Sequence, residues 1–437
     1  MQKPTAMGIT RRTFMGRAGI LAAGATVGIP SMVLSANWKE EALKWQPQLQ
    51  SKTPEENAKD ESFWAWVRQC YTLNYNLINL NNGGVSPQPK QVQDAVDHHY
   101  HQSNQGPSYY MWRILDQGRE PLRRELAEYA GCSPEELAIN RNASEALETI
   151  IFGLNLKKGD EVLVDRYDYP NMLNAWKQRE KREGIVLVYV NLDPVRMSDA
   201  QIKEAYVSNM SKKTKVLHIT HLINWNGRIL PVKAVADEAK ARGIDVLCDG
   251  AHSFAHVPYS IPDLNCDYYG TSLHKWLSAP FGTGMMYIRK EKIASVWPLL
   301  APEKPESDDI RKFESLGTRN FALEQGIREA LEFQRWIGNE NKHARLQYLK
   351  KYWTSKVASK ADVEINTPLN PESSCSLVHL GYKGKTGAEI EQHLFGKYKV
   401  HCVAIDYEGL KGVRITPHVY TSLRDLDVLV EGILSLT

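Results

Sequence analysis

Short apolar runs alternate with amphipathic helical patterns from about residue 80 to about residue 320. The apolar runs, each four to six residues long, predict strands over Glu161–Asp165, Ile185–Val190, Lys215–Thr220, Asp245–Asp249, Asp267–Gly270 and Gly284–Ile288. Helical spacing predicts helices over Ala143–Leu156, Asn171–Glu183 and Val232–Arg242, with Gly243 as a C-terminal cap. This alternation predicts an α/β fold with a largely parallel sheet, helices on both faces, and ligand binding at the carboxyl ends of the strands.

The pattern differs on either side of this region. Residues 38–79 read as a helical arm that contains tryptophans and charges, and residues 302–309 read as an exposed, Pro-rich and acidic loop. After a helical stretch over Phe321–Tyr352, short strands alternate with helices: Ser376–Leu380, Thr386–Lys397, Val400–Ile405, Gly412–Thr416 and Ser422–Leu436. We therefore predict four segments: a signal segment at 1–36, an arm at 37–80, a large domain at 81–320, and a small α+β domain at 321–437.

The N-terminal segment has the pattern of a twin-arginine export signal. Arg11 and Arg12 precede Phe14 and an uncharged stretch of 17 residues, Ala18–Leu34, which glycines dilute. A membrane anchor needs roughly 20 apolar residues, so this stretch is marginal as a span. Gly16 stands where such signals usually have lysine. We expect a mature chain that starts near Asn37, lies folded in the periplasm with its cofactor, and is not inserted in the membrane.

The composition excludes several classes of partner. Of the 437 residues 42% are hydrophobic and 24% charged, and the formal net charge of +3 comes from scattered, balanced charges, which argues against nucleic-acid binding. The six cysteines are dispersed without metal-ligand spacing, so we expect free, buried thiols and no metal site. His98, His99 and His101 lie close in sequence, but no carboxylate spacing supports a metal cluster, and a polar helix face is the simpler interpretation.

Two residues at predicted strand ends suggest a cofactor that neither would suggest alone. Asp249 ends one strand in Cys248-Asp249-Gly250-Ala251-His252, and Lys275 follows another in Ser272-Leu273-His274-Lys275. Pyridoxal 5'-phosphate needs a lysine that carries its aldehyde as a Schiff base and a carboxylate that keeps its ring nitrogen protonated. The pair therefore predicts this cofactor, with Lys275 as the base that moves protons at the substrate Cα.

A third motif suits the phosphate of that cofactor. Asn142-Ala143-Ser144-Glu145 opens a predicted helix with a capping residue and then small residues, which let the backbone approach a ligand closely. The free N–H groups at a helix start bind phosphate well. Ala143 and Ser144 are therefore candidate phosphate ligands, although the pattern is common as a helix cap alone.

On these motifs, the chain from about Leu80 to the C-terminus resembles the class V aminotransferase family of fold-type I pyridoxal phosphate enzymes, and within it the isopenicillin N epimerase-like subgroup. The resemblance implies a mostly parallel sheet of the seven-stranded type in the large domain. It also implies further cofactor-binding residues. These are Ser272 and His274 at the phosphate, Tyr169 stacked on the ring with Tyr167 as the alternative, Asn224 at the phenolic oxygen, and His252 beside the ring.

Gly317-Thr318 resembles a segment that, in dimers of this family, reaches the phosphate bound by the neighbouring subunit. This implies a homodimer in which Thr318 completes the partner's site. On local sequence alone, a plain turn explains the same two residues equally well.

The resemblance also implies how a substrate is held. Arg414, in Gly412-Val413-Arg414-Ile415-Thr416, matches the arginine that binds the carboxylate of the substrate, which a planar guanidinium does through two parallel hydrogen bonds. Asn82, Tyr110 and Arg319 are weaker candidates for the substrate pocket. A surface or structural role for Arg414 is the alternative. The expected partner is a small molecule with an amino group.

Several reactions fit these residues. Transamination needs only Lys275 on one face of the substrate, whereas epimerisation also needs a proton donor on the opposite face, and no residue can be assigned to it. Cysteine desulfuration needs a reactive cysteine in the loop before Arg414, and residues 406–411 contain none, while Cys402 precedes them in an apolar pattern. We therefore expect aminotransferase-type chemistry, with epimerisation or tailoring of a secreted siderophore peptide as alternatives. A non-catalytic cofactor-binding protein is disfavoured by the intact set of Lys275, Asp249 and Arg414.

Overall fold

The structure is a computed structural model, and it describes residues 38–437. The chain divides into two units, residues 1–48 and 49–437. Helix α3 (Trp38–Ser51) begins in the first unit and contains Pro47. The predicted signal segment lies outside the described residues.

A seven-stranded sheet forms the centre of the second unit. Its strands are β2 (Leu137–Asn140), β3 (Glu161–Asp165), β4 (Val186–Val190), β5 (Thr214–Thr220), β6 (Asp245–Asp249), β7 (Tyr268–Ser272) and β8 (Gly284–Ile288). They lie in the order β2-β8-β7-β6-β5-β3-β4, and β8 alone runs against the other six. This mostly parallel sheet with flanking helices confirms the predicted α/β fold.

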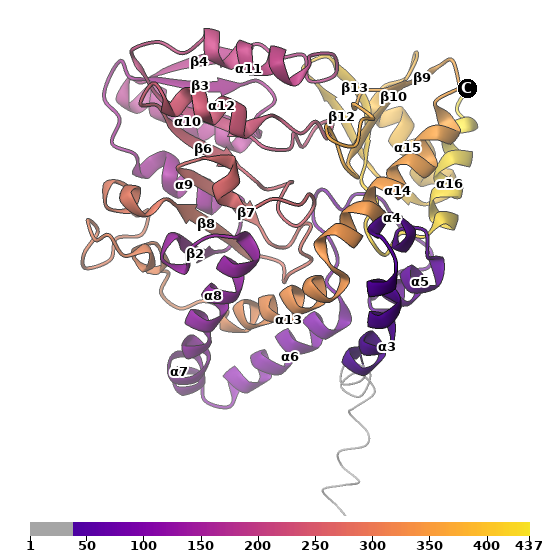
Figure 1. Cartoon of the computed structure of the whole chain (residues 1–437), viewed down its shortest axis with the longest axis horizontal. Coiled ribbons are helices and arrows are strands. Elements are labelled where there is room, and N and C mark those ends of the chain that lie inside the picture. Colours follow the sequence, from indigo (N-terminus) through magenta and orange to yellow (C-terminus); the bar gives the residue numbers. More distant parts are fainter. Residues whose placement is uncertain (1–37) are drawn as a thin grey trace, which may run out of the picture. The chain divides into compact units, whose positions relative to one another are not determined.

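Alternating side chains along the strands contribute to two hydrophobic layers on opposite faces of the sheet. Figure 1 shows the helices that flank this sheet. On one face, residues such as Leu163, Leu217 and Val246 pack with helices α8 (Arg119–Ala130), α11 (Asp199–Ser208), α12 (Val232–Lys240) and α13 (Phe321–Ile337). On the other face, residues such as Val216 and Leu247 pack with α9 (Ala143–Gly153) and α10 (Pro170–Glu183). Because successive strand residues point to opposite faces, both layers follow from continuous apolar strands.

A smaller antiparallel sheet is built from the C-terminal part of the chain. Its order is β12-β13-β10-β9, with bounds β9 (Val363–Ile365), β10 (Val378–Tyr382), β12 (Val403–Tyr407) and β13 (Leu410–Ile415). Side chains from α14 (Asn339–Val357), α15 (Gly387–Tyr398) and α16 (Leu423–Leu434) form a separate core with it. The helices and the strands of the expected α+β pattern are therefore both present, while the domain boundaries at residues 80 and 320 stay a prediction.

The segment before the large sheet reaches the C-terminal part of the chain. Strand β1 (Ile78–Asn79) pairs in parallel with β11 (Val400–His401), and α13 packs against α6 (Lys90–Asn104). The remaining elements are short: α4 (Pro54–Asn57), α5 (Glu61–Gln69), α7 (Pro107–Tyr109), a π-helical turn at Tyr110–Leu115, and 3₁₀ turns at Asp116–Gly118, Pro134–Glu136, Ile261–Leu264, Lys290–Ser295 and Ile310–Glu314. Among residues 38–437, no helix has the length and apolar character that a membrane span requires.

Candidate active site

One cavity of about 320 Å³ lies at the carboxyl ends of β5, β6 and β7, which Thr220, Asp249 and Ser272 mark. Further walls come from the start of α9, the start of α10, and β13. Ten residues that the sequence predicted for the site line this cavity: Ala143, Ser144, Tyr169, Asn224, Asp249, His252, Ser272, His274, Lys275 and Arg414. The topology thus brings together side chains from six separate stretches of sequence at the edge where parallel sheets bind ligands.

Lys275 lies three residues beyond β7, with its Nζ 3.0 Å from Nε2 of His252. The pKa of Lys275 is lowered to about 8, mainly by burial and in part by the nearby Arg414, while Asp249 opposes the shift. Burial also holds the pKa of His252 well below its usual range, so this imidazole is neutral and can accept a hydrogen bond from the lysine. A lysine with such a pKa is more readily a nucleophile or base than a surface lysine.

Asp249 is the last residue of β6 and is 4% exposed. Its Oδ1 accepts a hydrogen bond of 2.8 Å from the N–H of Ala251. Burial raises the pKa of Asp249, while that N–H, His218 and Lys275 lower it. The carboxylate is therefore buried but has neighbours that stabilise its ionised form.

The start of α9 forms another wall of the cavity. Asn142 caps the helix, since its side chain accepts a hydrogen bond of 2.9 Å from the N–H of Glu145. The N–H of Ala143 donates to Oγ of Ser272 at 2.9 Å, so β7 and the helix start share one polar group. On Gly284 a Cβ would lie 2.6 Å from Cα of Asn142, and this close approach of β8 requires glycine.

Tyr169 is the N-terminal capping residue of α10 and lines the cavity with 39% of its surface exposed. The alternative, Tyr167, is 9% exposed, donates its hydroxyl to the carbonyl of Glu408 at 2.9 Å, and does not line the cavity. The structure therefore favours Tyr169 over Tyr167 as the aromatic platform.

Arg414 on β13 is 7% exposed. Its guanidinium donates to the backbone carbonyl of Asn224 at 2.9 Å and to Oδ1 of Asn81 at 3.1 Å. Burial lowers its pKa to about 10, so it stays cationic near neutral pH. None of the described carboxylates, over residues 38–437, forms an ion pair with it.

Four predicted residues do not line the cavity. Asn82 is buried beside it, where its Nδ2 donates to the carbonyl of Thr416 at 2.8 Å and its Oδ1 accepts from the hydroxyl of Tyr420 at 2.6 Å. Tyr110 begins the π-helical turn, and Thr318 lies exposed in the loop before α13. In the single chain Asn82 and Tyr110 therefore do not line this cavity, and their place in a substrate pocket stays a prediction.

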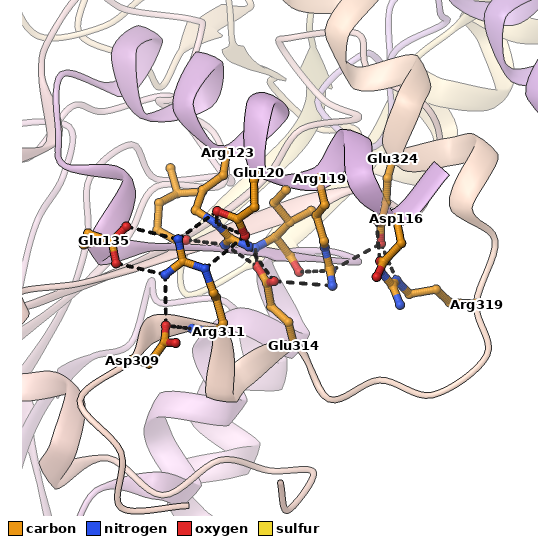
Figure 2. Close-up of polar contacts among 12 residues, drawn as sticks. Asp116, Arg119, Glu120, Arg123, Glu135, Asp309, Arg311, Glu314, Arg319 and Glu324 are labelled. Atoms are coloured by element: carbon orange, nitrogen blue, oxygen red, sulfur yellow. Dashed lines mark hydrogen bonds and ion pairs between the residues drawn. The ribbon is translucent and has the colours of Figure 1, made fainter. Parts of the chain in front are cut away.

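Arg319 is engaged elsewhere (Figure 2). Its Nε donates to Oε1 of Glu324 at 2.6 Å, and its Nη2 donates to Oδ1 of Asp116 at 3.0 Å. The guanidinium also lies 4.0 Å from the ring centroid of Phe321. These partners occupy Arg319, which does not line the cavity of its own chain, and its place in a substrate pocket stays a prediction.

Several lining residues escaped the sequence analysis: Gly83, Gly84, Leu147, Met172, Thr220 and Ala251. The Gly83-Gly84 pair is a sequence signal that could have been used, since two adjacent glycines often mark a place where the backbone passes close to other groups. A Cβ on Gly83 would lie 3.1 Å from Thr416 and 3.5 Å from the guanidinium carbon of Arg414. Met172 and Leu147 are apolar helix residues that no local pattern distinguishes from core residues.

The histidines and cysteines outside the cavity have local structural surroundings. His99 contacts Gln102, and His101 contacts the carbonyl of Asp97 one turn back on α6. In the part of the chain that the structure describes, no group of three or more His, Cys, Asp or Glu could hold a metal ion. The six cysteines, all within residues 38–437, are free thiols, and none lines the cavity.

The cavity fits pyridoxal 5'-phosphate. Within residues 38–437, Oδ1 of Asn224, Nδ1 of His252 and Nε of Arg414 are buried without a hydrogen-bond partner. Orphaned polar atoms of this kind are few in folded proteins, and in a cavity they indicate a ligand. Asp249 suits the ring nitrogen, and the helix start at Ala143 with Ser272 suits a phosphate.

Comparisons with known proteins agree with this geometry. The family described as aminotransferase class-V matches residues 78–426. The chain is 26% identical over 393 residues to isopenicillin N epimerase of Streptomyces clavuligerus, which covers 86% of this chain and 98% of that protein. It is 24% identical to cysteine desulfurase of Haloferax volcanii, over 82% of this chain and 88% of that protein.

Among solved structures, the apo cysteine desulfurase of Thermococcus onnurineus superposes with a TM-score of 0.75 at 23% identity, covering 85% of this chain and 98% of that chain. A variant of C-DES with glycine covalently linked to its PLP cofactor superposes with a TM-score of 0.76 at 20% identity. The match covers 85% of this chain and 99% of that chain. At this identity the likeness shows the fold. The chain belongs to the class-V aminotransferase family and is a fold-type I enzyme that depends on pyridoxal 5'-phosphate.

Proposed function

We propose that this enzyme catalyses aminotransferase-type chemistry at the amino group and Cα of an amino acid or of a small molecule that contains one. Arg414 gives the strongest support. It is a buried cation whose only hydrogen bonds, within the described residues, are to neutral oxygen atoms. Leaving a buried charge unpaired is costly unless a partner arrives, and a substrate carboxylate supplies that partner.

The residues around the cavity divide the work. Bound pyridoxal 5'-phosphate supplies an aldehyde and an electron-withdrawing ring. Lys275 takes a proton from the substrate Cα and returns it, helped by a pKa of about 8. Arg414 orients the substrate by its carboxylate, Tyr169 packs on the ring, and Asp249 holds the ring nitrogen protonated.

Exchange of Arg414 tests the assignment of the substrate. Arg414→Gln should raise the KM for an amino acid by about 10–100-fold, the value of one charge-assisted interaction, and should leave the KM for the matching amine without a carboxylate nearly unchanged. Arg414→Lys keeps the charge but not the planar guanidinium, so its KM for the amino acid should lie between those of the wild type and of Arg414→Gln. An equal rise in KM for the amino acid and for the amine would contradict the assignment. The substrates come from amino-acid and peptide pools, with products followed by mass.

Epimerisation is the second candidate, since two isopenicillin N epimerases are 26% identical to this chain over 86% of its length. The two reactions give different products from the same substrate in D₂O. Transamination yields an oxo acid and requires an amino acceptor. Epimerisation yields the mirror configuration at Cα with one deuterium and needs no acceptor. Chiral chromatography with mass detection therefore decides between them.

Desulfuration has weaker support. Burial raises the pKa of Cys402 to about 12, and no cysteine lines the cavity where a sulfur acceptor is needed. A buried thiol is a poor nucleophile. Incubation with cysteine and assay of released sulfide checks this point directly.

We also propose that the enzyme is a homodimer exported by the twin-arginine route. The dimer rests on the exposed Gly317-Thr318 segment, and export rests on Arg11 and Arg12, which lie outside the described residues. Exchange of both arginines for lysine should keep the precursor inside the cell at unchanged activity per molecule. Periplasmic, processed double-lysine protein would contradict the export proposal, as would a mature wild-type chain that keeps residues 1–36.

A further inference from the structure

The hairpin that carries Arg414 has a sharply defined tip. Its strands β12 and β13 are joined by the two-residue turn Glu408-Gly409, where φ is +46° and +86°. Positive φ at both turn positions is the geometry of a tight hairpin, whose twist matches that of its strands. Tyr407 and Leu410 are the last pair before the turn and lie directly opposite each other.

Alternate residues of β13 pack in different cores. Val413 and Ile415 pack in the core of the small sheet, whereas Leu410, which is 5% exposed, packs in a core of the large sheet. Arg414 lies four residues after Leu410, so both side chains are on the same face of the strand. This face therefore meets the large-sheet part of the chain at two points about 13 Å apart, the hairpin tip and the cavity wall.

Two tyrosine hydroxyls hold the tip on the large-sheet part. The hydroxyl of Tyr407 donates to the carbonyl of Arg166 at 2.8 Å, and the hydroxyl of Tyr167 donates to the carbonyl of Glu408 at 2.9 Å. The ring of Tyr407 also stacks on Trp225, with ring centroids 4.3 Å apart and an angle of 22° between the planes. The tip thus contacts two separate loops, the one after β3 and the one after β5.

These two loops also supply walls of the cavity. Tyr167 lies two residues before the ring platform Tyr169, and Trp225 directly follows Asn224. The carbonyl of Asn224 accepts a hydrogen bond of 2.9 Å from Arg414. The contacts at the tip therefore tie together the chain segments that carry Tyr169, Asn224 and Arg414.

The other end of β13 is anchored by backbone contacts. The N–H of Thr416, just after the strand, donates to the carbonyl of Leu80 at 2.7 Å, and Thr416 forms a bridge with Asn81. Arg414 lies between this anchor and the tip. Loss of the tip contacts should therefore let the strand tilt about Thr416 and move the guanidinium relative to Tyr169.

We propose that Tyr167 and Tyr407 are positioning residues, a tyrosine clamp that fixes Arg414 at the distance from the ring platform that a substrate carboxylate requires. The inference rests on the proposed function, in which Arg414 binds that carboxylate. Binding through two parallel hydrogen bonds tolerates little displacement of the guanidinium. In a chain with a released hairpin, binding has to restore the closed position, so the penalty can reach the stabilisation lost with each hydroxyl.

Tyr167→Phe and Tyr407→Phe test the clamp, since each removes one hydroxyl and keeps the ring. Glycine and methylamine are the probes for the holoenzyme, because both are primary amines that react with the cofactor aldehyde and only glycine has a carboxylate. Titration of the visible absorbance of the cofactor gives a Kd for each, and the ratio of the two is the preference for glycine. Each variant should lower this preference by about two- to tenfold, the value of one hydrogen bond, and the double variant should lower it further. The Kd of methylamine should not change.

Two further variants make the result specific. Tyr382→Phe is the matched control, because its hydroxyl donates to the carbonyl of Leu436 at 2.7 Å and its ring packs in the core of the small sheet. It should leave the preference for glycine unchanged. Arg414→Gln gives the preference that remains without the arginine. If the wild type shows no greater preference than Arg414→Gln, the proposed role of Arg414 is wrong, whatever the clamp does.

Hydrogen–deuterium exchange examines the clamp without a substrate. The amides of Tyr407 and Leu410 should exchange about two- to tenfold faster in the double variant than in the wild type and in Tyr382→Phe. Faster exchange supports a clamp at the tip even if the role of Arg414 is wrong, and unchanged exchange overturns it. An unchanged preference for glycine in the double variant, when Arg414→Gln lowers that preference, would equally overturn the proposal.

Discussion

The surroundings of Lys275 disfavour a positive charge on balance, although Asp249 favours it. Burial and Arg414 lower its pKa to about 8, below the 10.5 of a free lysine. The neutral, reactive amine therefore becomes the main form as pH rises through about 8. In the apoprotein, competitive labelling with an amine reagent should show Lys275 gaining reactivity with a midpoint near pH 8. The exposed Lys212 serves as reference within the same sample. A midpoint for Lys275 near that of a free lysine would contradict the burial argument.

Loss of this amine should also remove the reaction. Lys275→Ala should retain less than about one thousandth of the wild-type turnover, because no other lysine lines the cavity to act as the base. The visible absorbance of the cofactor–lysine imine should disappear at the same time. Lys212→Ala is the control for a change of net charge. Turnover of Lys275→Ala at the wild-type rate would refute the assignment.

The residue types near strand ends were the predictable part of the site. Lys275, Asp249 and Arg414 stand out because the cofactor and a carboxylate substrate need those functional groups. Thr220 and Met172 were missed because a threonine at a strand end or a methionine on a helix has many structural roles. The ion pairs of Arg319 could not be predicted, because Asp116, in the 3₁₀ turn before α8, and Glu324, on α13, are brought to it by tertiary packing that no local pattern reports.

At the scale of elements, a buried ion-pair network joins α8, β2, the 3₁₀ turn Ile310–Glu314 and the start of α13 (Figure 2). Glu314 lies at its centre. Its carboxylate accepts from Arg123 at 2.5 and 2.7 Å, and from the N–H of Ile139 at 2.7 Å, while Arg119 lies 3.3 Å away. Because β2 is an edge strand, this carboxylate also satisfies an N–H that the sheet leaves unpaired.

Glu314→Gln should therefore lower the free energy of unfolding by about 3–5 kcal/mol, since it leaves two buried arginines without their shared partner. Glu135→Gln is the matched control. Its side chain is 51% exposed and pairs with Arg311, so its loss should cost less than about 1 kcal/mol. Chemical denaturation of both variants measures the difference. Equal effects would mean that the network adds little beyond its surface pairs.

Most strands and helices were predicted within three residues, and Glu161–Asp165, Asp245–Asp249 and Gly284–Ile288 match the structure at both ends. The helical stretch Phe321–Tyr352 is two helices, α13 and α14, and the strand Val400–Ile405 is divided into β11 and β12. The four residues of β2 were missed because the run is short and polar residues follow at once. The reversed direction of β8 could not be predicted either. Strand direction depends on pairing between segments distant in sequence, whereas hydrophobic spacing reports only the burial of each segment.

For the whole molecule, the proposed homodimer leads to a specific prediction. Thr318 is exposed, and glycine is required before it because Gly317 has φ +66°. Thr318→Ala should weaken cofactor binding by about tenfold through loss of one hydrogen bond to phosphate, with the dimer mass by light scattering unchanged. Ser315→Ala, in the same exposed loop, should have no effect.

Mixing two defective variants tests whether the site is shared. A mixed dimer contains one Lys275→Ala chain and one Thr318→Ala chain. In one of its two sites, the Thr318→Ala chain supplies Lys275 and the Lys275→Ala chain supplies Thr318, so this site contains both residues. Mixed dimers should regain wild-type cofactor affinity and activity at that site. A monomeric mass with full activity, or no recovery on mixing, would contradict a shared site.

The cavity draws its walls from residues as early as Gly83 and as late as Arg414, and this has a consequence for biosynthesis. Lys275 leaves the ribosome 139 residues before Arg414. At roughly 5–20 residues per second, that interval lasts between about 7 and 28 s. During it, the nascent chain contains Lys275 but not Arg414, which helps to lower the pKa of this lysine and which we propose binds the substrate. We therefore expect productive loading with cofactor only in the finished polypeptide, and we expect a chain that stalls in translation before β13 to lack both the lowered lysine pKa and the means to select a substrate.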